Sequence, residues 1–175
     1  MSTNRIQHLI AAAVFVALAA AVTLTLGFII GSDAAKSGPN AAKQRVAIVS
    51  KGVESDSGSG EFVLIPLQAG ALTRDSGTGS AVSSKRFVMR EGQRLQITGG
   101  VETVNGQRGS LELRFRIEWV EAGNGHHVGA GTWKIVRGTG QNAQLAGGGR
   151  RADVWLDRGP WPWSGRAEGF LTQPS

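Results

Sequence analysis

The clearest pattern in the chain is a strict alternation of apolar and charged residues between Ser110 and Val120. Side chains at every second position of a β-strand point to the same face, so this pattern predicts a strand with one buried and one solvated face. The apolar face consists of Leu111, Leu113, Phe115, Ile117 and Trp119. The opposite face carries Glu112, Arg114, Arg116 and Glu118. We interpret this charged face as a solvent-facing row of ion pairs, and a polar barrel interior for an acidic ligand is the alternative.

Similar short runs recur along the rest of the chain, with turn signals between them. The further predicted strands cover residues 45–50, 60–67, 71–73, 81–90, 94–104, 128–136, 151–157 and 165–171. These eight or nine short strands predict an all-β fold, an antiparallel meander closed as an eight-stranded barrel, with a two-sheet sandwich as the alternative.

A hairpin is predicted between residues 94–104 and 110–121, because Asn105-Gly106 is a strong turn signal. Burying one face of each strand favours a three-residue loop that pairs Val104 with Arg108. The buried face of the earlier strand would then hold Leu95, Ile97, Gly99 and Val101. The expected cross-strand partners are Val101 with Leu111, Ile97 with Phe115 and Leu95 with Ile117.

The N-terminal part has a different character, since residues 9–30 contain no charged side chain. A run of this length can cross the roughly 30 Å hydrocarbon core of a bilayer. Cleavage as a signal peptide near Ser32-Asp33-Ala34 is the alternative. We therefore expect a signal-anchor or transmembrane helix over residues 1–31, a flexible linker over 32–44 and the β-barrel domain over 45–175.

The same segment predicts location: a cell membrane with an exported C-terminal domain, or secretion if the segment is cleaved. The flanking charges run against this orientation, because Lys36, Lys43 and Arg45 outnumber Arg5.

Composition excludes several functions. The chain has no cysteine, so it has no thiol nucleophile, disulfide or cysteine-based zinc site. His126 and His127 follow the turn signal Asn124-Gly125 and are expected to lie exposed at a hairpin end without further metal ligands. The net charge of +6 is scattered, and for an exported domain we expect no nucleic-acid partner. We expect no metal and no cofactor.

Residues 131–150 are rich in glycine but lack the GxxxxGK[ST] pattern of a phosphate-binding loop. A strand-like run, 152–156, follows them instead of a helix, so we interpret the glycines as places where sheet backbone bends or packs closely.

The pattern Gly138-Thr139-Gly140-x-x-Ala143-x-Leu145-x-Gly147-Gly148-Gly149 resembles the closing segment of the allene oxide cyclase and dirigent barrels. The preceding segment 106–111 is also similar to bacterial domains of this calycin-like, eight-stranded type. The resemblance implies a barrel with an interior for an apolar ligand. Allene oxide cyclases steer the cyclisation of a fatty-acid epoxide, and dirigent proteins steer the coupling of phenoxy radicals. No catalytic position of either family is carried over to a residue of this chain.

Candidate ligand-contacting residues are the large apolar side chains expected inside the barrel or at its mouth. They are Leu113, Phe115, Ile117, Trp119, Trp133, Trp161 and Trp163. Trp161 and Trp163 alternate with prolines, and this rigid loop either contacts a ligand, a sugar or a membrane, or plugs the barrel. Asp153 and Asp157 flank Trp155, but two nearby carboxylates alone do not make a glycosidase. No catalytic residue is assigned.

The function favoured by these observations is a non-catalytic binding module for an apolar small molecule. Two alternatives stay open. A cofactor-free enzyme of the cyclase or dirigent type would be favoured by a cavity with a buried carboxylate or arginine. A structural envelope protein that acts through its surface would be favoured by an interior filled with Leu113, Phe115, Ile117 and Trp119.

Overall fold

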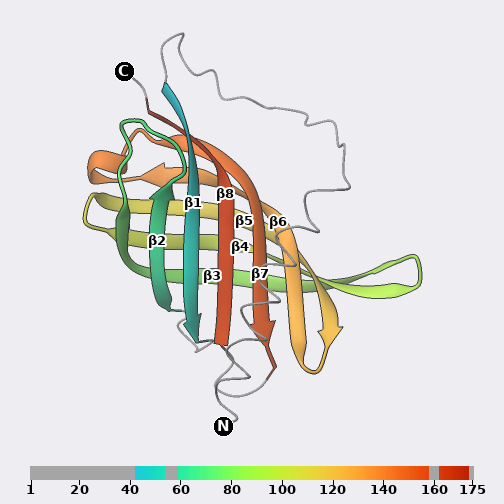
Figure 1. The fold of residues 1–175 in the computed structure, drawn as a ribbon. Helices are drawn as coiled ribbons and strands as arrows, with labels where there is room; N and C mark the ends of the chain where they lie inside the picture. The colour runs from blue at the N-terminus through green and yellow to red at the C-terminus, as the bar shows by residue number, and fades with distance from the viewer. Residues whose placement is uncertain (1–41, 54–58, 158–161, 174–175) are drawn as a thin grey trace. The chain divides into compact units, whose positions relative to one another are not determined.

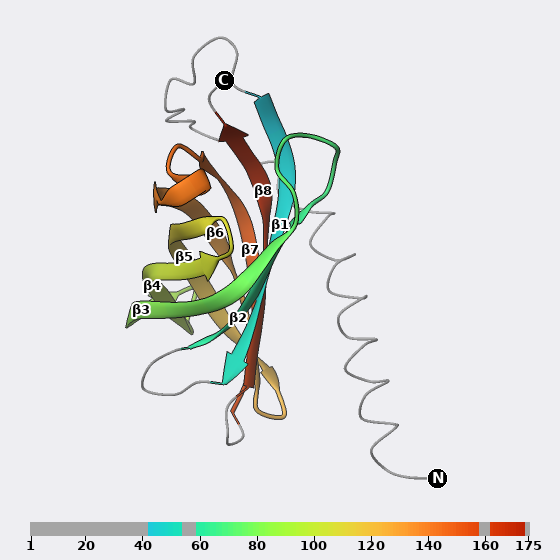
Figure 2. The ribbon, with the colours of Figure 1, turned by 90° about the vertical axis from the view of Figure 1, so that its left-hand side faces the viewer.

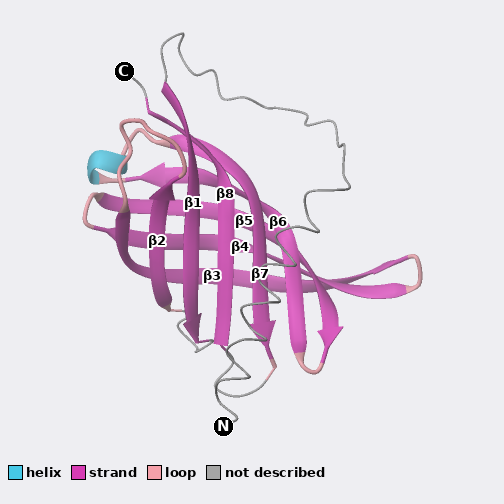
Figure 3. Cartoon of the chain, in the orientation of Figure 1, coloured by secondary structure: helices cyan, strands magenta, loops and turns pink. Residues whose placement is uncertain are grey.

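The chain folds as a β-barrel, as seen in a computed structural model that describes residues 42–53, 59–157 and 162–173. Eight antiparallel strands pair in chain order, and β1 pairs with β8 to close the sheet (Figure 1). The one helix in these ranges is a single 3-10 turn, η1 (Gly140–Asn142), as Figure 3 shows. The prediction of an all-β fold with eight antiparallel strands is confirmed. In the same ranges no helix has the length and apolar character needed to span a bilayer.

The strands are mostly longer than the sequence predicts. They are β1 (Ala42–Val53), β2 (Gly60–Pro66), β3 (Asp75–Arg90), β4 (Gln93–Gly106), β5 (Gly109–Gly123), β6 (His126–Gly138), β7 (Ala146–Leu156) and β8 (Pro162–Gln173). The predicted strand over 71–73 is wrong, because these residues belong to the connection between β2 and β3. The predicted helix over 1–31 and most of the linker lie outside the described residues.

Strand β5 has the predicted faces. Leu111, Leu113, Phe115 and Ile117 are at most 7 % exposed, whereas the charged residues between them lie on the outer face. There Glu118 binds Arg90 at 2.9 Å and Arg116 at 3.0 Å. The hydrogen bond from Arg90 is the main reason why the pKa of Glu118 lies below its ordinary value. In this outer row, Glu118 thus forms two solvent-exposed ion pairs, each worth about 1 kcal/mol or less.

The β4–β5 hairpin does not have the predicted register. Val104 pairs with Leu111, and the turn is Gln107-Arg108, between Gly106 and Gly109. Every β4 residue thus pairs three positions further along β5 than expected, and an odd shift turns the other face of β4 inward. The inward face of β4 holds Gln96, Thr98, Gly100, Glu102 and Val104. The apolar set Leu95, Ile97, Gly99 and Val101 lies on the outer face.

Two features hold the turn at this position. The Asp75 carboxylate accepts the backbone N–H groups of Gln107 at 3.0 Å and Arg108 at 3.4 Å. Gly109 has a φ of +123°, and a Cβ there would lie 2.1 Å from the Thr139 carbonyl oxygen, so only glycine fits. Asn105 and Gly106, the predicted turn residues, pair within the strand ladder instead.

One end of the barrel is plugged by two connections, residues 67–74 and 139–145, which lie at the same end in Figures 1 and 2. Leu72 and Leu145 extend from them into the core. Gln44 fixes the first connection: its Oε1 accepts the Leu72 N–H at 2.8 Å, and its Nε2 donates to the carbonyls of Leu72 at 3.1 Å and Gln68 at 2.9 Å. The buried side chains packed with them are Val46, Ile48, Phe62, Leu64, Val104, Leu111, Leu113, Trp133, Ala167 and Leu171.

The glycines of β7 allow close packing against the neighbouring strands. A Cβ at Gly149 would lie 2.0 Å from the Glu168 carbonyl oxygen on β8. Gly147 combines a φ of +153° with a Cβ position 2.1 Å from the Phe170 carbonyl oxygen. The interpretation of these glycines as points of close backbone packing is confirmed.

The plug generates a first prediction. Gln44→Leu removes two buried hydrogen bonds and one half-buried hydrogen bond. Backbone groups of the 67–74 connection then lack partners, which costs about 1–3 kcal/mol for each unsatisfied buried group. We expect the free energy of unfolding, measured by urea denaturation, to fall by at least about 2 kcal/mol. Gln144→Leu, at an exposed position, is the matched control and should change stability by less than about 0.5 kcal/mol. Equal stability of the two variants would contradict this account of the plug.

Candidate ligand-binding cavity

The half of the barrel interior away from the plug is hollow. It contains a cavity of about 430 Å³, within the range of roughly 300–1,000 Å³ typical of small-molecule sites. Its apolar lining is Ala81, Val82, Phe115, Ile117, Trp119, Trp155 and Trp163. Its polar lining includes Lys85, Gln96, Thr98, Glu102, His127, Arg151 and Asp153. The cavity reaches the surface along β3, where the lining residue Val82 is 82 % exposed.

The structure divides the candidate residues predicted from sequence into two groups. Phe115, Ile117, Trp119 and Trp163 line the cavity. Leu113 and Trp133 do not line it and are buried in the plugged half, where the Trp133 Nε1–H donates to the Glu168 carbonyl at 3.3 Å. Trp161 lies outside the described residues. Trp163 is part of β8 and pairs with Trp155, so it forms barrel wall rather than a loop.

A buried charged cluster lies where the plug ends and the cavity begins. The guanidinium of Arg151 donates through Nε to both oxygens of Asp153, at 2.8 and 2.9 Å, and through Nη1 to Glu102. Ser50 Oγ donates to the other Glu102 oxygen at 2.9 Å. The side chains of Glu102, Arg151 and Asp153 are 4, 7 and 5 % exposed. We call Ser50, Glu102, Arg151 and Asp153 the charged cluster.

The inward-facing residues of β4, β7 and β8 show where the charged cluster lies in the barrel. Along β4 they run from Val104 in the plug through Glu102 to Thr98 and Gln96 in the cavity. On β7 the inward face holds Arg151 and Asp153, followed by Trp155. On β8, Gly165 makes room for the cluster, because a Cβ there would lie 2.2 Å from Asp153 Oδ1. Arg151 also lies over the Phe115 ring, with 5.0 Å between Cζ and the ring centroid.

Burial and charge act in opposite directions on these groups. Burial raises the pKa of Asp153, and this effect outweighs the attraction of Arg151, so the pKa lies above its ordinary value. For Arg151, burial lowers the pKa, but the charges of Glu102 and Asp153 outweigh it, so the pKa lies above its ordinary value and the guanidinium stays charged. With both carboxylates ionised the cluster would carry one net negative charge, which a proton on Asp153 removes.

Aromatic side chains form much of the outer cavity wall. The Trp119 Nε1–H donates to Thr98 Oγ1 at 3.1 Å, and this bond fixes the indole. The rings of His127 and Trp155 lie 4.5 Å apart, and Lys85 Nζ lies 5.9 Å from the Trp155 ring. The Trp155 Nε1–H is buried and has no hydrogen-bond partner within the described ranges. A buried N–H in a cavity wall is a donor that a ligand oxygen can satisfy.

The histidines differ from the expectation. His126 is exposed, as predicted, but His127 is half-buried and lines the cavity, since neighbouring strand residues point to opposite faces. In the part of the chain that the structure describes, no group of three histidine, aspartate or glutamate side chains is arranged to hold a metal ion.

Sequence reasoning missed the charged cluster. It considered Asp153 only as a partner of Asp157, yet Asp157 is exposed and Asp153 binds Arg151. The available signal was the spacing Arg151-x-Asp153-x-Trp155, which puts two charges and an indole on one face of a strand. Nothing in the sequence links Glu102 or Ser50 to them, because these residues come from other strands.

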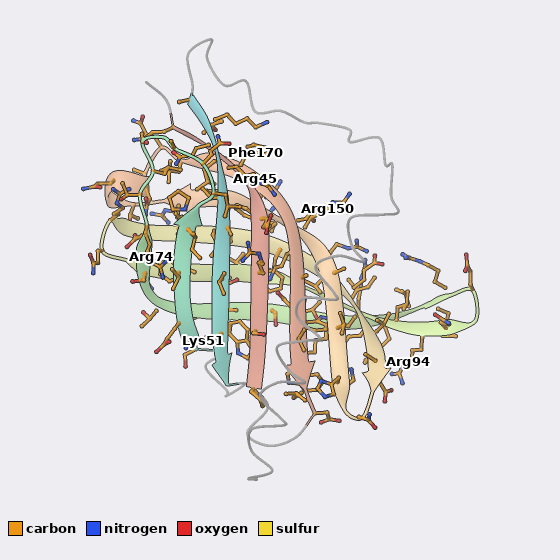
Figure 4. All side chains as sticks on the ribbon, viewed as in Figure 1. Arg45, Lys51, Arg74, Arg94, Arg150 and Phe170 are labelled. Carbon is orange, nitrogen blue, oxygen red and sulfur yellow. The ribbon has the colours of Figure 1, made fainter. Side chains whose placement is uncertain are left out.

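Breaking the cluster should destabilise the barrel. Arg151→Met leaves two buried carboxylates without their cation, which costs about 3–5 kcal/mol in comparable buried pairs. We expect the free energy of unfolding to fall by that amount, measured by urea denaturation followed by tryptophan fluorescence. The matched control is Arg150→Met on the outer face (Figure 4 labels Arg150), with a change of less than about 0.5 kcal/mol. Similar losses for both variants would rule out a special role for Arg151.

Asp153 should also make stability depend on pH. A carboxyl whose pKa is raised by folding binds its proton more tightly in the folded state, so folding stability falls as pH rises from the unfolded pKa, about 4, to the folded pKa. In Asp153→Asn the side chain at this position cannot ionise, so the variant does not lose folding stability in this way as pH rises. The variant should therefore gain stability relative to the natural chain as pH is raised over this window, measured by urea unfolding at a series of pH values. A difference that stays constant with pH would contradict the raised pKa.

Comparison of the chain with models of protein families, with curated proteins and with solved structures found no match. The resemblance to the allene oxide cyclase and dirigent barrels therefore stays a prediction.

Proposed function

We propose that this protein is an exported or membrane-anchored, calycin-like barrel that binds one apolar small molecule in the cavity. The observation that carries the proposal is a hollow of about 430 Å³ with aromatic walls that ends on the buried charged cluster. Apolar pockets with a few fixed polar groups are typical of small-molecule sites, because the walls supply affinity and the polar groups orient the ligand.

The polar groups favour one kind of ligand. The buried Trp155 N–H has no hydrogen-bond partner within the described residues, and it suits an oxygen acceptor. A ligand carboxylate would meet Glu102 and Asp153 in a site of low dielectric, where like charges repel strongly. Arg151 does not offset this, because it already binds both carboxylates. The ligand is therefore an apolar molecule with a neutral oxygen group, such as an alcohol, ketone or epoxide.

The second candidate function is a cofactor-free enzyme of the cyclase or dirigent type. It is favoured by the buried carboxylates and arginine that line the cavity, the feature that separates it from a simple binding barrel. Fixed buried charges such as Glu102, Arg151 and Asp153 can stabilise charge that develops on a reacting ligand beside them. Incubation with the ligand that co-purifies distinguishes the two: an enzyme changes its structure or stereochemistry, and a binding barrel returns it unchanged.

A surface-acting structural role has less support. It would need Phe115, Ile117 and Trp119 to fill the interior, but these side chains line a cavity.

Displacement of a neutral fluorescent probe, N-phenyl-1-naphthylamine, tests the proposal on the full chain in detergent. Ser83 lines the cavity, whereas its neighbour Ser84 does not. Ser83→Trp fills the cavity without touching the charged cluster and should weaken probe binding at least about tenfold, that is by about 1.4 kcal/mol. Ser84→Trp, the control, should bind the probe as the natural chain does.

The same assay tests the ligand class. A long-chain alcohol should displace the probe at lower concentration than the fatty acid of equal length, by about tenfold at neutral pH. Equal binding of the probe by both tryptophan variants would place it outside the cavity and refute the site. A fatty acid that competes as well as the alcohol would refute the choice of ligand but not the site.

A further inference from the structure

The end of the β3–β4 hairpin, residues 85–95, is separate from the cavity walls described above, apart from Lys85 at its base. Strand β3 pairs with β2 only as far as Gly79, and β4 pairs with β5 only from Gln96 onward. Within the described ranges the last residues of the hairpin are thus a two-stranded ribbon, and Figure 1 shows it extending past the other strands. It turns at Glu91-Gly92, both with positive φ, as in a type I′ turn. We call residues 85–95 the hairpin tip.

The hairpin tip exposes large apolar side chains. Phe87 is 55 % exposed and Met89 is 69 % exposed, and their spacing puts them on one face of β3. The guanidinium of Arg94 lies over the Phe87 ring, 3.9 Å from its centroid. Single exposed apolar residues are ordinary on protein surfaces, but a pair on a projecting ribbon is available to a partner.

The tip is also basic. It carries Lys85, Arg86, Arg90 and Arg94 against a single carboxylate, Glu91, so four positive charges and one negative charge leave a net charge of +3. Arg90 binds Glu118 on β5, at 2.9 Å. Arg86 and Arg94 are exposed on the two strands of the ribbon. Apolar side chains and clustered cations on one element are the combination that binds anionic lipid surfaces.

We propose that the hairpin tip docks on an anionic membrane surface, with Phe87 and Met89 in the interface and the basic side chains at the lipid headgroups. The charge argues against a second copy of the chain, because pairing two tips would bring two charges of +3 together. The uncharged run at residues 9–30, if it anchors the chain as predicted, brings the barrel to such a surface at high effective concentration.

The absence of cysteine makes a direct test available, since a single introduced thiol can be labelled specifically. Met89→Cys in the full chain carries the environment-sensitive dye NBD, and the protein is reconstituted into phosphatidylcholine vesicles with or without phosphatidylserine. Nitroxide groups on the lipid chains quench a dye that enters the bilayer. We expect strong quenching with phosphatidylserine, and quenching reduced at least fivefold without it. The matched control is Lys134→Cys, an exposed position on β6, which should not be quenched in either case.

A second variant separates charge from insertion. Arg86→Gln combined with Arg94→Gln should weaken docking roughly 25-fold, at about fivefold for each charge removed. Quenching at position 89 that is unaffected by phosphatidylserine or by this double variant would overturn the proposal. So would equal quenching at positions 89 and 134. Energy transfer between tips labelled with donor and acceptor dyes, in detergent without lipid, would show self-association and would likewise overturn it.

Discussion

The guanidinium of Arg151 is held inside the barrel between the carboxylates of Glu102 and Asp153, and this arrangement constrains much of the fold. A charge buried without partners would cost several kcal/mol. Strands β4 and β7 must therefore both turn inward the faces that carry these three residues. For β4 this means that Glu102 and Thr98 face the interior while Ile97 and Val101 face outward. For β7 it means that Arg151, Asp153 and Trp155 share the interior with the cavity. Gly165 on β8 leaves the space that the cluster occupies.

The two halves of the barrel, on either side of the charged cluster, serve different purposes. On one side, Leu72 and Leu145 from the end connections complete a dry core, and Gln44 fixes the first connection through three hydrogen bonds. On the other side, the same strands continue with glycine and polar residues on β4 and with Trp119 and Trp155 on β5 and β7, which leaves a cavity. The core and the cavity are continuous, because Phe115 and Ile117 belong to the core and also line the cavity.

Sequence patterns predicted the structural features that depend on a single strand. Strand β5 alternates strictly between apolar and charged residues, so its faces and its outer ion pairs followed from the period alone. The predicted β4 face was wrong because the more apolar face of this strand points outward, and the choice depends on Asp75, Gly109 and Arg151 in other elements. Of the cavity aromatics, Trp119 was predicted in a strand of the barrel, whereas Trp163 was predicted in a loop at its mouth. Their neighbours Glu102 and Arg151 were not predicted, because the contact joins residues 49 positions apart.

Native mass spectrometry of the full chain, purified from its own host in mild detergent, shows directly whether a ligand occupies the cavity. We expect one small molecule on each polypeptide, apolar, with a neutral oxygen group, and also present in an organic extract of the same sample. A bare polypeptide mass, under conditions in which detergent adducts still survive, would contradict the claim that the cavity beside Arg151 is a ligand site.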